Sequence, residues 1–203
     1  MKAEARKIEY AREPGYFLNL GDGWDIEKFP LLWTIGNAAL LKSDLLAIFC
    51  SRKCPGSIVR ISHDFAEDLR ARGIPVIGGF QTPVEKMFLE VLLKGEAPVV
   101  VCPARGIQSI RLLPEWSQPL DESRLLVVSP FGPRQRHATK DTAEVRNRFV
   151  SAAADRLFFL YASPKSRTMT LAGELLQEGR EIETFDVKEN VELVQAGARR
   201  QGR

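Results

Sequence analysis

The sequence predicts an α/β fold, a doubly wound and mostly parallel sheet of about six strands with helices on both faces. Two observations predict it: apolar runs of strand length without alternation, and segments between them with apolar residues at helical spacing. A longer link near residues 106–123 divides these units into two halves. We therefore expect a Rossmann-like domain over residues 45–187, an irregular lead-in with one short strand over 1–44, and a frayed tail over 188–203.

The first half of the chain contains a short strand and three core strands. The lead-in is rich in Gly, Asp, Pro and Trp, and a short strand is predicted at 31–35. LLAIF at 45–49 predicts the first core strand, and the helix after it has apolar residues at helical spacing, at Ile58, Ile61, Phe65 and Leu69. VIGG at 76–79 predicts the second strand, a helix begins near Pro83, and PVVVC at 98–102 predicts the third.

The second half repeats this alternation. Asp141 and Glu144 have the spacing of a capping box that opens a helix. A second helix is predicted over 168–178, and Gly179 at its C′ position would end it. Apolar runs at 125–129 and 157–162 predict two further strands, and EIETF at 181–185 predicts a sixth, short strand. These elements complete the expected sheet of about six strands.

Composition excludes several classes of protein. The chain has 203 residues, 44% of them hydrophobic and 27% charged, with a formal net charge of +3. No segment approaches the roughly 20 apolar residues that cross a bilayer, and the charged first residues do not resemble a signal peptide, so we expect a cytoplasmic protein without a membrane partner. The chain has three cysteines, Cys50, Cys54 and Cys102. They are too few for a disulfide framework and lack zinc-finger spacing, so we expect no metal site.

The positive charge is concentrated in one segment. Residues 129–167 hold eight Lys or Arg against three Asp or Glu, a net charge of +5, so the rest of the chain sums to −2. Ligands of doubly wound sheets bind beyond the carboxyl ends of the strands, where the strand order reverses, and this segment supplies two of the loops at that edge. The sequence therefore predicts a cationic cleft for a phosphate-bearing ligand.

Candidate binding residues also follow the first two core strands. Ser51, Arg52 and Lys53 offer a hydroxyl and two cations for an anion, or else form a solvated loop. Gly78 and Gly79 would let a phosphate approach the backbone, or else form only a tight turn. The G-x-G-x-x-G and P-loop patterns are absent, so we expect no dinucleotide cofactor.

A third candidate is Arg146-Asn147-Arg148, near the start of a predicted helix. Side chains two residues apart on a helix diverge by about 200°, so we expect one of the two arginines to bind a carboxylate elsewhere in the protein. No nucleophile, paired carboxylates or zinc-protease motif stands at a recognisable spacing. We therefore predict no catalytic residue and no enzymatic activity.

The ordered set of motifs resembles a known family. LLAIFCSRK, VIGGF, LLVVSPFGP and RNRFVSAAADRLFFLYASPKSRTMTLAGELLQEGREI occur in sequence within residues 29–185. They are similar to the Rossmann domain of the DNA-processing protein A family (DprA, also called Smf) in the SLOG superfamily, with its G-S-R, S-G, S-E and R-N-R motifs. The resemblance implies a basic pocket for single-stranded DNA phosphates, transfer of that DNA to the RecA recombinase, and a homodimer.

The resemblance assigns roles to particular residues. Ser51 and Arg52 match G-S-R, Gly79 matches the glycine of S-G, Ser129 matches the serine of S-E, and 146–148 matches R-N-R. Together with the neighbouring cations, these matches predict phosphate binding by Ser51, Arg52, Lys53, Gly78, Gly79, Ser129, Lys140, Arg146, Asn147, Arg148, Lys165 and Arg167.

The chain departs from the family pattern in the same loops. Cys50 replaces the glycine of G-S-R, QTPVE at 81–85 replaces A-R-G-I-D, and Pro130 replaces the glutamate of S-E. Tyr161 replaces a glutamate, and Arg167 stands where the family has glycine. A Cβ and thiol at position 50 narrow the approach of a phosphate, whereas Arg167 adds a cation. We also expect a stand-alone core without the helical module and winged helix of full-length members.

Three functions remain open at this point. The first is a DprA-like protein that binds single-stranded DNA without catalysis. The second is a SLOG-type sensor of a nucleotide-derived ligand. The third is a phosphoribohydrolase similar to the LOG branch, although the loop SPKSRTMTLAGE lacks the glycine run that holds phosphate there. Binding of oligonucleotides, binding of mononucleotides alone, or release of a free base would separate the three.

Overall fold

A computed structural model describes residues 6–9 and 31–201 of the chain. The strands of this part are β1 (Arg6–Glu9), β2 (Leu31–Gly36), β3 (Leu46–Cys50), β4 (Val76–Gly78), β5 (Val99–Val101), β6 (Leu125–Ser129), β7 (Arg156–Tyr161), β8 (Ile182–Phe185) and β9 (Arg199–Gln201). The α-helices are α1 (Gly56–Ala71), α2 (Pro83–Leu92), α3 (Ser117–Asp121), α4 (Lys140–Ala152), α5 (Arg167–Gln177) and α6 (Val191–Ala196). Short 3₁₀ helices are η1 (Ala38–Lys42), η2 (Pro114–Trp116) and η3 (Lys188–Asn190).

The strand order places the topological switch point between β3 and β7. The sheet runs β1-β2-β6-β5-β4-β3-β7-β8-β9. From β3 to β6 each strand adds beside the previous one, and the chain then returns to the other side of β3 with β7, β8 and β9, all in parallel. β1 and β2 are antiparallel and extend the sheet beyond β6. We call the edge where the parallel strands end the carboxyl edge, and the loops after β3 and β7 leave it at the switch point.

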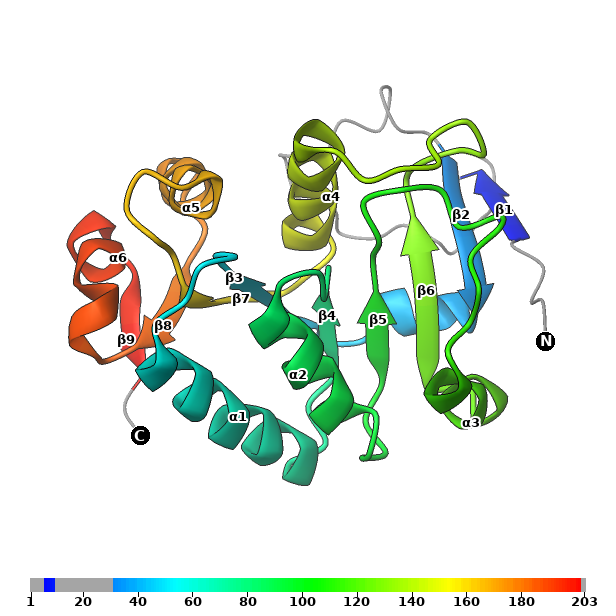
Figure 1. The fold of residues 1–203 in the computed structure, drawn as a ribbon, viewed down its shortest axis with the longest axis horizontal. Coiled ribbons are helices and arrows are strands. Elements are labelled where there is room, and N and C mark those ends of the chain that lie inside the picture. Colours follow the sequence, from blue (N-terminus) through cyan, green and yellow to red (C-terminus); the bar gives the residue numbers. More distant parts are fainter. Residues whose placement is uncertain (1–5, 10–30, 202–203) are drawn as a thin grey trace.

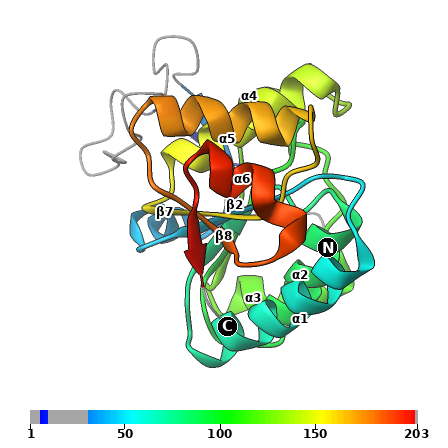
Figure 2. The ribbon, with the colours of Figure 1, turned by 90° about the vertical axis from the view of Figure 1, so that its left-hand side faces the viewer.

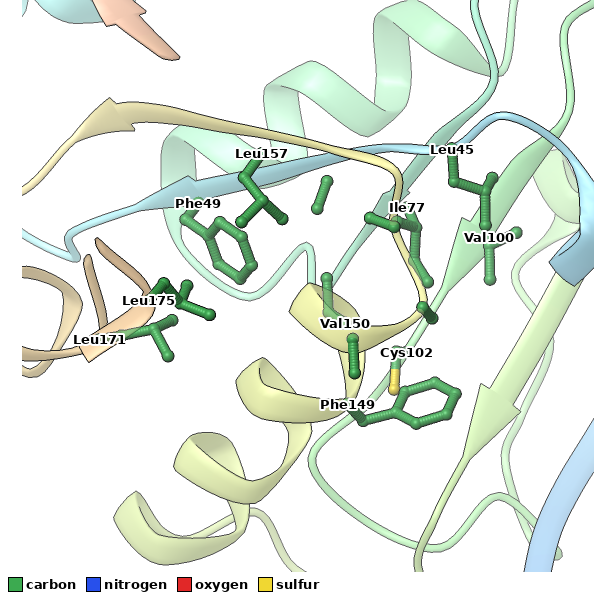
Figure 3. Packing of buried hydrophobic residues seen from close by; sticks show 14 of the residues in the cluster. Leu45, Phe49, Ile77, Val100, Cys102, Phe149, Val150, Leu157, Leu171 and Leu175 are labelled. Carbon is green, nitrogen blue, oxygen red and sulfur yellow. The ribbon is translucent and has the colours of Figure 1, made fainter. Parts of the chain in front are cut away.

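Helices cover both faces of the sheet. Figures 1 and 2 show α1, α2 and α3 on one face and α4, α5 and α6 on the other. In β3, Ala47 and Phe49 belong to the core beneath α4 and α5, whereas Leu46 and Ile48 belong to the core beneath α1 and α2. Figure 3 shows part of the first core, where Phe49 of β3, Ile77 of β4 and Leu157 of β7 lie in one cluster with side chains of α4 and α5. A strand covered on both faces must be apolar throughout, and this explains the runs without alternation.

The structure confirms the fold class and the predicted core strands, but the sheet is wider than expected. Its nine strands in the described residues include β1 and β9, which no apolar run announced. The predicted short strand is β2, and Gly179 ends α5 with a φ of +79°. In the described part of the lead-in, β1, β2 and η1 are regular, and the rest of that prediction falls on 1–5 and 10–30, outside the described residues.

The prediction of a frayed tail is wrong for residues 188–201. They form η3, α6 and β9, and β9 pairs in parallel with β8. Leu193 is fully buried, and Asn190 donates hydrogen bonds to the Leu160 carbonyl (3.0 Å) and to Thr184 Oγ1 (2.8 Å). The tail has no long apolar period because α6 is short and docks through one side chain. Residues 202 and 203 lie outside the described part of the chain.

The start of α4 also differs from the prediction. Thr139 is the N-cap: its Oγ1 accepts from the Thr142 amide (3.1 Å), and Thr142 Oγ1 accepts from the Thr139 amide (2.8 Å). The expected box of Asp141 and Glu144 is therefore wrong, because two hydroxyls satisfy these amides instead. Both carboxylates lie near Arg167. Among the described helices, none has the length and apolar character that crossing a bilayer requires.

Candidate functional site

A cavity of about 640 Å³ opens at the carboxyl edge, among α4, α5 and the loops that follow β3 and β4. Phe49 and Phe80 contribute apolar walls. Its cationic side chains are Arg52, Lys86, Lys140, Arg146 and Arg167, and its carboxylates are Glu85, Glu144 and Glu174. The cavity lies at the switch point, where the fold class leads us to expect a ligand.

The structure brings together only part of the predicted set. The predicted residues that line the cavity are Arg52, Lys140, Arg146, Asn147 and Arg167. Those that do not line it are Ser51, Lys53, Gly78, Gly79, Ser129, Arg148 and Lys165. The neighbours of each side chain explain the division, and they also identify two residues that sequence analysis missed, Glu85 and Lys86.

Glu85 holds together the ends of β3 and β4. Its carboxylate is buried, with Oε1 accepting from the Cys50 amide (3.1 Å) and Oε2 accepting from the amides of Gln81 (2.9 Å) and Thr82 (3.1 Å). Thr82 Oγ1 completes a capping box by accepting from the Glu85 amide. Two amides at the start of α2 and one at the end of β3 would suit a phosphate, but an internal carboxylate occupies them. The T-x-x-E spacing at 82–85 was the signal that could have revealed it.

Arg146 is buried in the cavity wall, where its side chain links other parts of the protein. It is only 4% exposed, and its guanidinium donates to the Cys102 carbonyl (3.0 Å) and to Gln81 Oε1 (3.2 Å). Its buried Nε has no partner among the described residues. Gly79 makes room for it, since a Cβ at position 79 would lie 1.4 Å from Arg146 Nη1. The glycine at this strand end therefore admits an arginine side chain.

Two sets of ion pairs join α4 to α5. Arg148 Nη2 lies 2.5 Å from Glu174 Oε2, and Arg167 Nη1 lies 3.5 Å from Asp141 Oδ1 and 3.3 Å from Glu144 Oε2. The divergence of Arg146 and Arg148 is confirmed: they leave α4 in different directions, and Arg148 binds the carboxylate. Arg146 and Arg148 both bind other groups of the protein, so they are less available to a ligand.

Arg52, Lys86 and Lys140 are the cations of the cavity that are exposed and that have no partner within residues 31–201. None of the three side chains forms an ion pair or hydrogen bond with another described residue. Arg52 follows β3, Lys86 lies in the first turn of α2, and Lys140 is the first residue of α4. Three separate elements thus direct unpaired positive charge toward one cavity.

The remaining predicted residues have other positions. Ser51 Oγ accepts from the Ser163 amide (2.9 Å) and contacts Ser166 Oγ (3.1 Å), so it joins the loops after β3 and β7. Ser129 Oγ donates to the Arg105 carbonyl (2.7 Å) and accepts from the Phe131 amide (3.1 Å). Gly78 ends β4, where a Cβ would lie 3.1 Å from Phe80 Cζ and 3.2 Å from Ile48 Cγ1, and Lys53 and Lys165 are exposed.

The cysteines are free thiols. A hydrogen bond with Cys54 and burial raise the pKa of Cys50, and the same hydrogen bond lowers the pKa of Cys54. Burial raises the pKa of Cys102 to about 12, against the opposing effect of Arg146. In the part of the chain that the structure describes, no group of three or more His, Cys, Asp or Glu side chains is placed to hold a metal ion.

Comparison with known proteins identifies relatives. The family model of DNA recombination-mediator protein A matches residues 18–201. DNA processing protein A from Streptococcus pneumoniae superposes with a TM-score of 0.78 at 18% identity, covering 97% of this chain and 70% of that one. No curated protein sequence matches the chain.

Two further solved structures extend the comparison. DNA processing protein A from Helicobacter pylori, described for its single-stranded DNA binding mode, has a TM-score of 0.73 at 20% identity, with 100% of this chain and 93% of that chain covered. The molybdenum cofactor binding protein of Rippkaea orientalis is more distant, with a TM-score of 0.54 at 10% identity over 79% of this chain and 88% of that chain. At these identities the likeness establishes the fold.

Proposed function

The chain belongs to the DNA recombination-mediator protein A family, and we propose that it binds single-stranded DNA at the carboxyl edge without catalysing a reaction. Arg52, Lys86 and Lys140 are the proposed phosphate contacts. The observation that carries the proposal is that these three cations line one cavity at the switch point and have no side-chain partner in the part of the chain that the structure describes. Cationic side chains grip a nucleic-acid backbone without reading its sequence. The Helicobacter pylori relative, described as binding single-stranded DNA, supports this class of ligand.

The internal carboxylate of Glu85 shapes how the phosphate would be held. Because Glu85 occupies the amides of Cys50, Gln81 and Thr82, the backbone at this point is not available to an anion. A phosphate must then be bound by side chains at the rim, which give affinity with strong dependence on salt. Phe80 lines the same cavity but is only 5% exposed, so it forms part of the apolar wall and is not an open stacking surface for a base.

The test is binding of fluorescent oligo-dT by anisotropy over a range of salt concentrations. The wild-type protein should bind, with log K falling linearly against log salt. Arg52→Ala should weaken binding about tenfold or more, since a charge-assisted hydrogen bond is worth about 1.5 to 3 kcal/mol. The matched control is Arg72→Ala, an exposed arginine after α1 that pairs with Asp68 away from the cavity. Absence of oligonucleotide binding at low salt would refute the proposal.

Two further measurements separate the other two functions. A rise in melting temperature with a mononucleotide, without any response to oligo-dT, would indicate a nucleotide sensor. Release of free base from AMP, abolished by Glu174→Ala, would indicate a phosphoribohydrolase. Glu174 lines the cavity, but its carboxylate is held by Arg148 at 2.5 Å. That contact favours a structural role for Glu174.

Three consequences of family membership complete the proposal. Transfer of the DNA to RecA, a homodimer and a cytoplasmic location are predictions that follow from a DNA-processing role. Light scattering of the purified protein measures the dimer directly. Co-elution with RecA in the presence and absence of oligo-dT measures the transfer complex.

A further inference from the structure

Two loops near the start of α4 carry positively charged side chains that do not line the cavity. One joins β5 to η2 and contains Arg105 and Arg111, and the other joins β6 to α4 and contains Arg134 and Arg136. All four arginines are exposed, and none forms an ion pair with another described residue. No Asp or Glu occurs in residues 97–114 or 123–140. Uncompensated charge of this density attracts polyanions.

The two loops are built as one surface. The Gly106 amide donates to the Gln135 carbonyl (2.7 Å), and the Arg105 carbonyl accepts from Ser129 Oγ (2.7 Å). The backbones approach so closely that a Cβ at Gly106 would lie 2.5 Å from the Gly132 carbonyl oxygen. These contacts hold Arg105 beside the loop that carries Arg134 and Arg136. Backbone contacts therefore fix the main-chain positions from which these arginine side chains extend.

One of the two loops leads along the chain to the rim of the cavity. The loop after β6 leads directly into α4, whose first residue, Lys140, lines the cavity. Arg136 precedes Lys140 by four residues and Arg134 precedes it by six, so the chain between them spans at most about 20 Å. In Figure 1 the loops after β5 and β6 lie at the end of the sheet where α4 begins. A strand that leaves the cavity past Lys140 would meet these arginines next.

We propose that Arg105, Arg134 and Arg136 form a second phosphate-binding segment, so that the ligand is an extended strand running from the cavity across the two loops. The inference rests on the proposed function and extends the proposed DNA-binding surface beyond the cavity. A ligand that fits within the cavity leaves these three guanidinium groups without a partner. A strand that continues over the loops neutralises them and releases further counterions.

The test compares a short and a long oligonucleotide. Anisotropy is measured with oligo-dT of about four and about sixteen nucleotides, which span the usual site sizes of single-strand-binding folds. The triple variant R105A/R134A/R136A should bind the long strand at least about tenfold more weakly. Its salt slope for the long strand should decrease in magnitude by about two, since each lost phosphate contact contributes about 0.7. Binding of the short strand should remain as in the wild type.

A matched control removes the same charge elsewhere. R72A/K94A/R199A replaces three exposed cations at the opposite, amino edge of the sheet, and it should bind both strands as the wild type does. If the wild type binds the long strand and R105A/R134A/R136A binds it with the same affinity, the inference is overturned while the proposed function stands. An equal loss in both variants would also overturn it. Failure of the wild type to bind either strand would instead refute the proposed function.

Discussion

At the scale of single residues, Gly79 and Arg146 depend on each other. The arginine is buried and bridges the ends of β4 and β5 through Gln81 and the Cys102 carbonyl. It can do so because position 79 has no side chain. The R-N-R motif, taken from sequence as a set of ligand contacts, therefore contributes a structural arginine, a half-buried asparagine and an arginine paired with Glu174.

Gly79→Ala should destabilise the fold. Its Cβ would lie 1.4 Å from Arg146 Nη1, and the displaced guanidinium would lose its hydrogen bonds. Overpacking of this kind costs about 1 to 3 kcal/mol, to be measured by urea unfolding. Gly173→Ala is the matched control, because its Cβ would meet nothing within 4 Å and alanine favours a helix. Equal stability of the two variants would contradict the role of Gly79.

At the scale of elements, Glu85 joins α2 to β3. The carboxylate accepts from the Cys50 amide at the end of the strand and from two amides at the start of its own helix. This contact fixes the loop after β4 against the loop after β3, and so positions Arg52 and Lys86 on the cavity. The geometry of the free cations thus depends on a residue that carries the opposite charge.

Glu85→Ala should cost roughly 3 kcal/mol of unfolding free energy. The substitution leaves buried amides unsatisfied, and one lost partner of a charged hydrogen-bonding group costs about 1.5 to 3 kcal/mol. Thr82→Ala, which removes only the hydroxyl of the same capping box, should cost about 1 kcal/mol. Chemical denaturation of both variants measures the difference. If Glu85→Ala lowers the unfolding free energy no more than Thr82→Ala does, the contact between Glu85 and the Cys50 amide contributes nothing to stability.

At the scale of the whole molecule, the segment after residue 187 is part of the domain. Leu193 is fully buried in the core beneath α5, and β9 extends the sheet from β8. Apolar burial at a few positions, together with the hydrogen bonds of Asn190, docks a segment that has little periodicity of its own. The edge strand β9 carries Arg199 and Arg200, each paired with a carboxylate, and charge on an edge strand disfavours aggregation.

Leu193→Ala should destabilise the entire domain in one transition. Removal of a buried leucine side chain costs about 2 to 5 kcal/mol. Val191→Ala in the same helix, where the valine is 46% exposed, should change the unfolding free energy little. Thermal unfolding followed by circular dichroism measures both variants. A separate early transition in Leu193→Ala would show that the tail unfolds independently of the sheet.

Sequence reasoning located the carboxyl edge and the cations near it, but it could not distinguish free cations from paired ones. Arg52 and Lys140 line the cavity as expected. Lys86 was missed, since a lysine in a helix beside ordinary turn residues carries no local signal. Arg148 and Arg167 look like ligand contacts in sequence, and both pair with carboxylates from another helix.

Periodicity of apolar residues is a local property, and it was enough to predict strands β2 to β8, helices α1, α2, α4 and α5, and the doubly wound class of this chain. The charge of each side chain is also local. Whether that charge is available depends on contacts between residues distant in the chain, such as Arg146 with the Cys102 carbonyl or Glu85 with the Cys50 amide. Such pairs meet only when the strands align and the helices pack. The fold therefore follows from patterns within segments, whereas the binding surface follows from how the segments assemble.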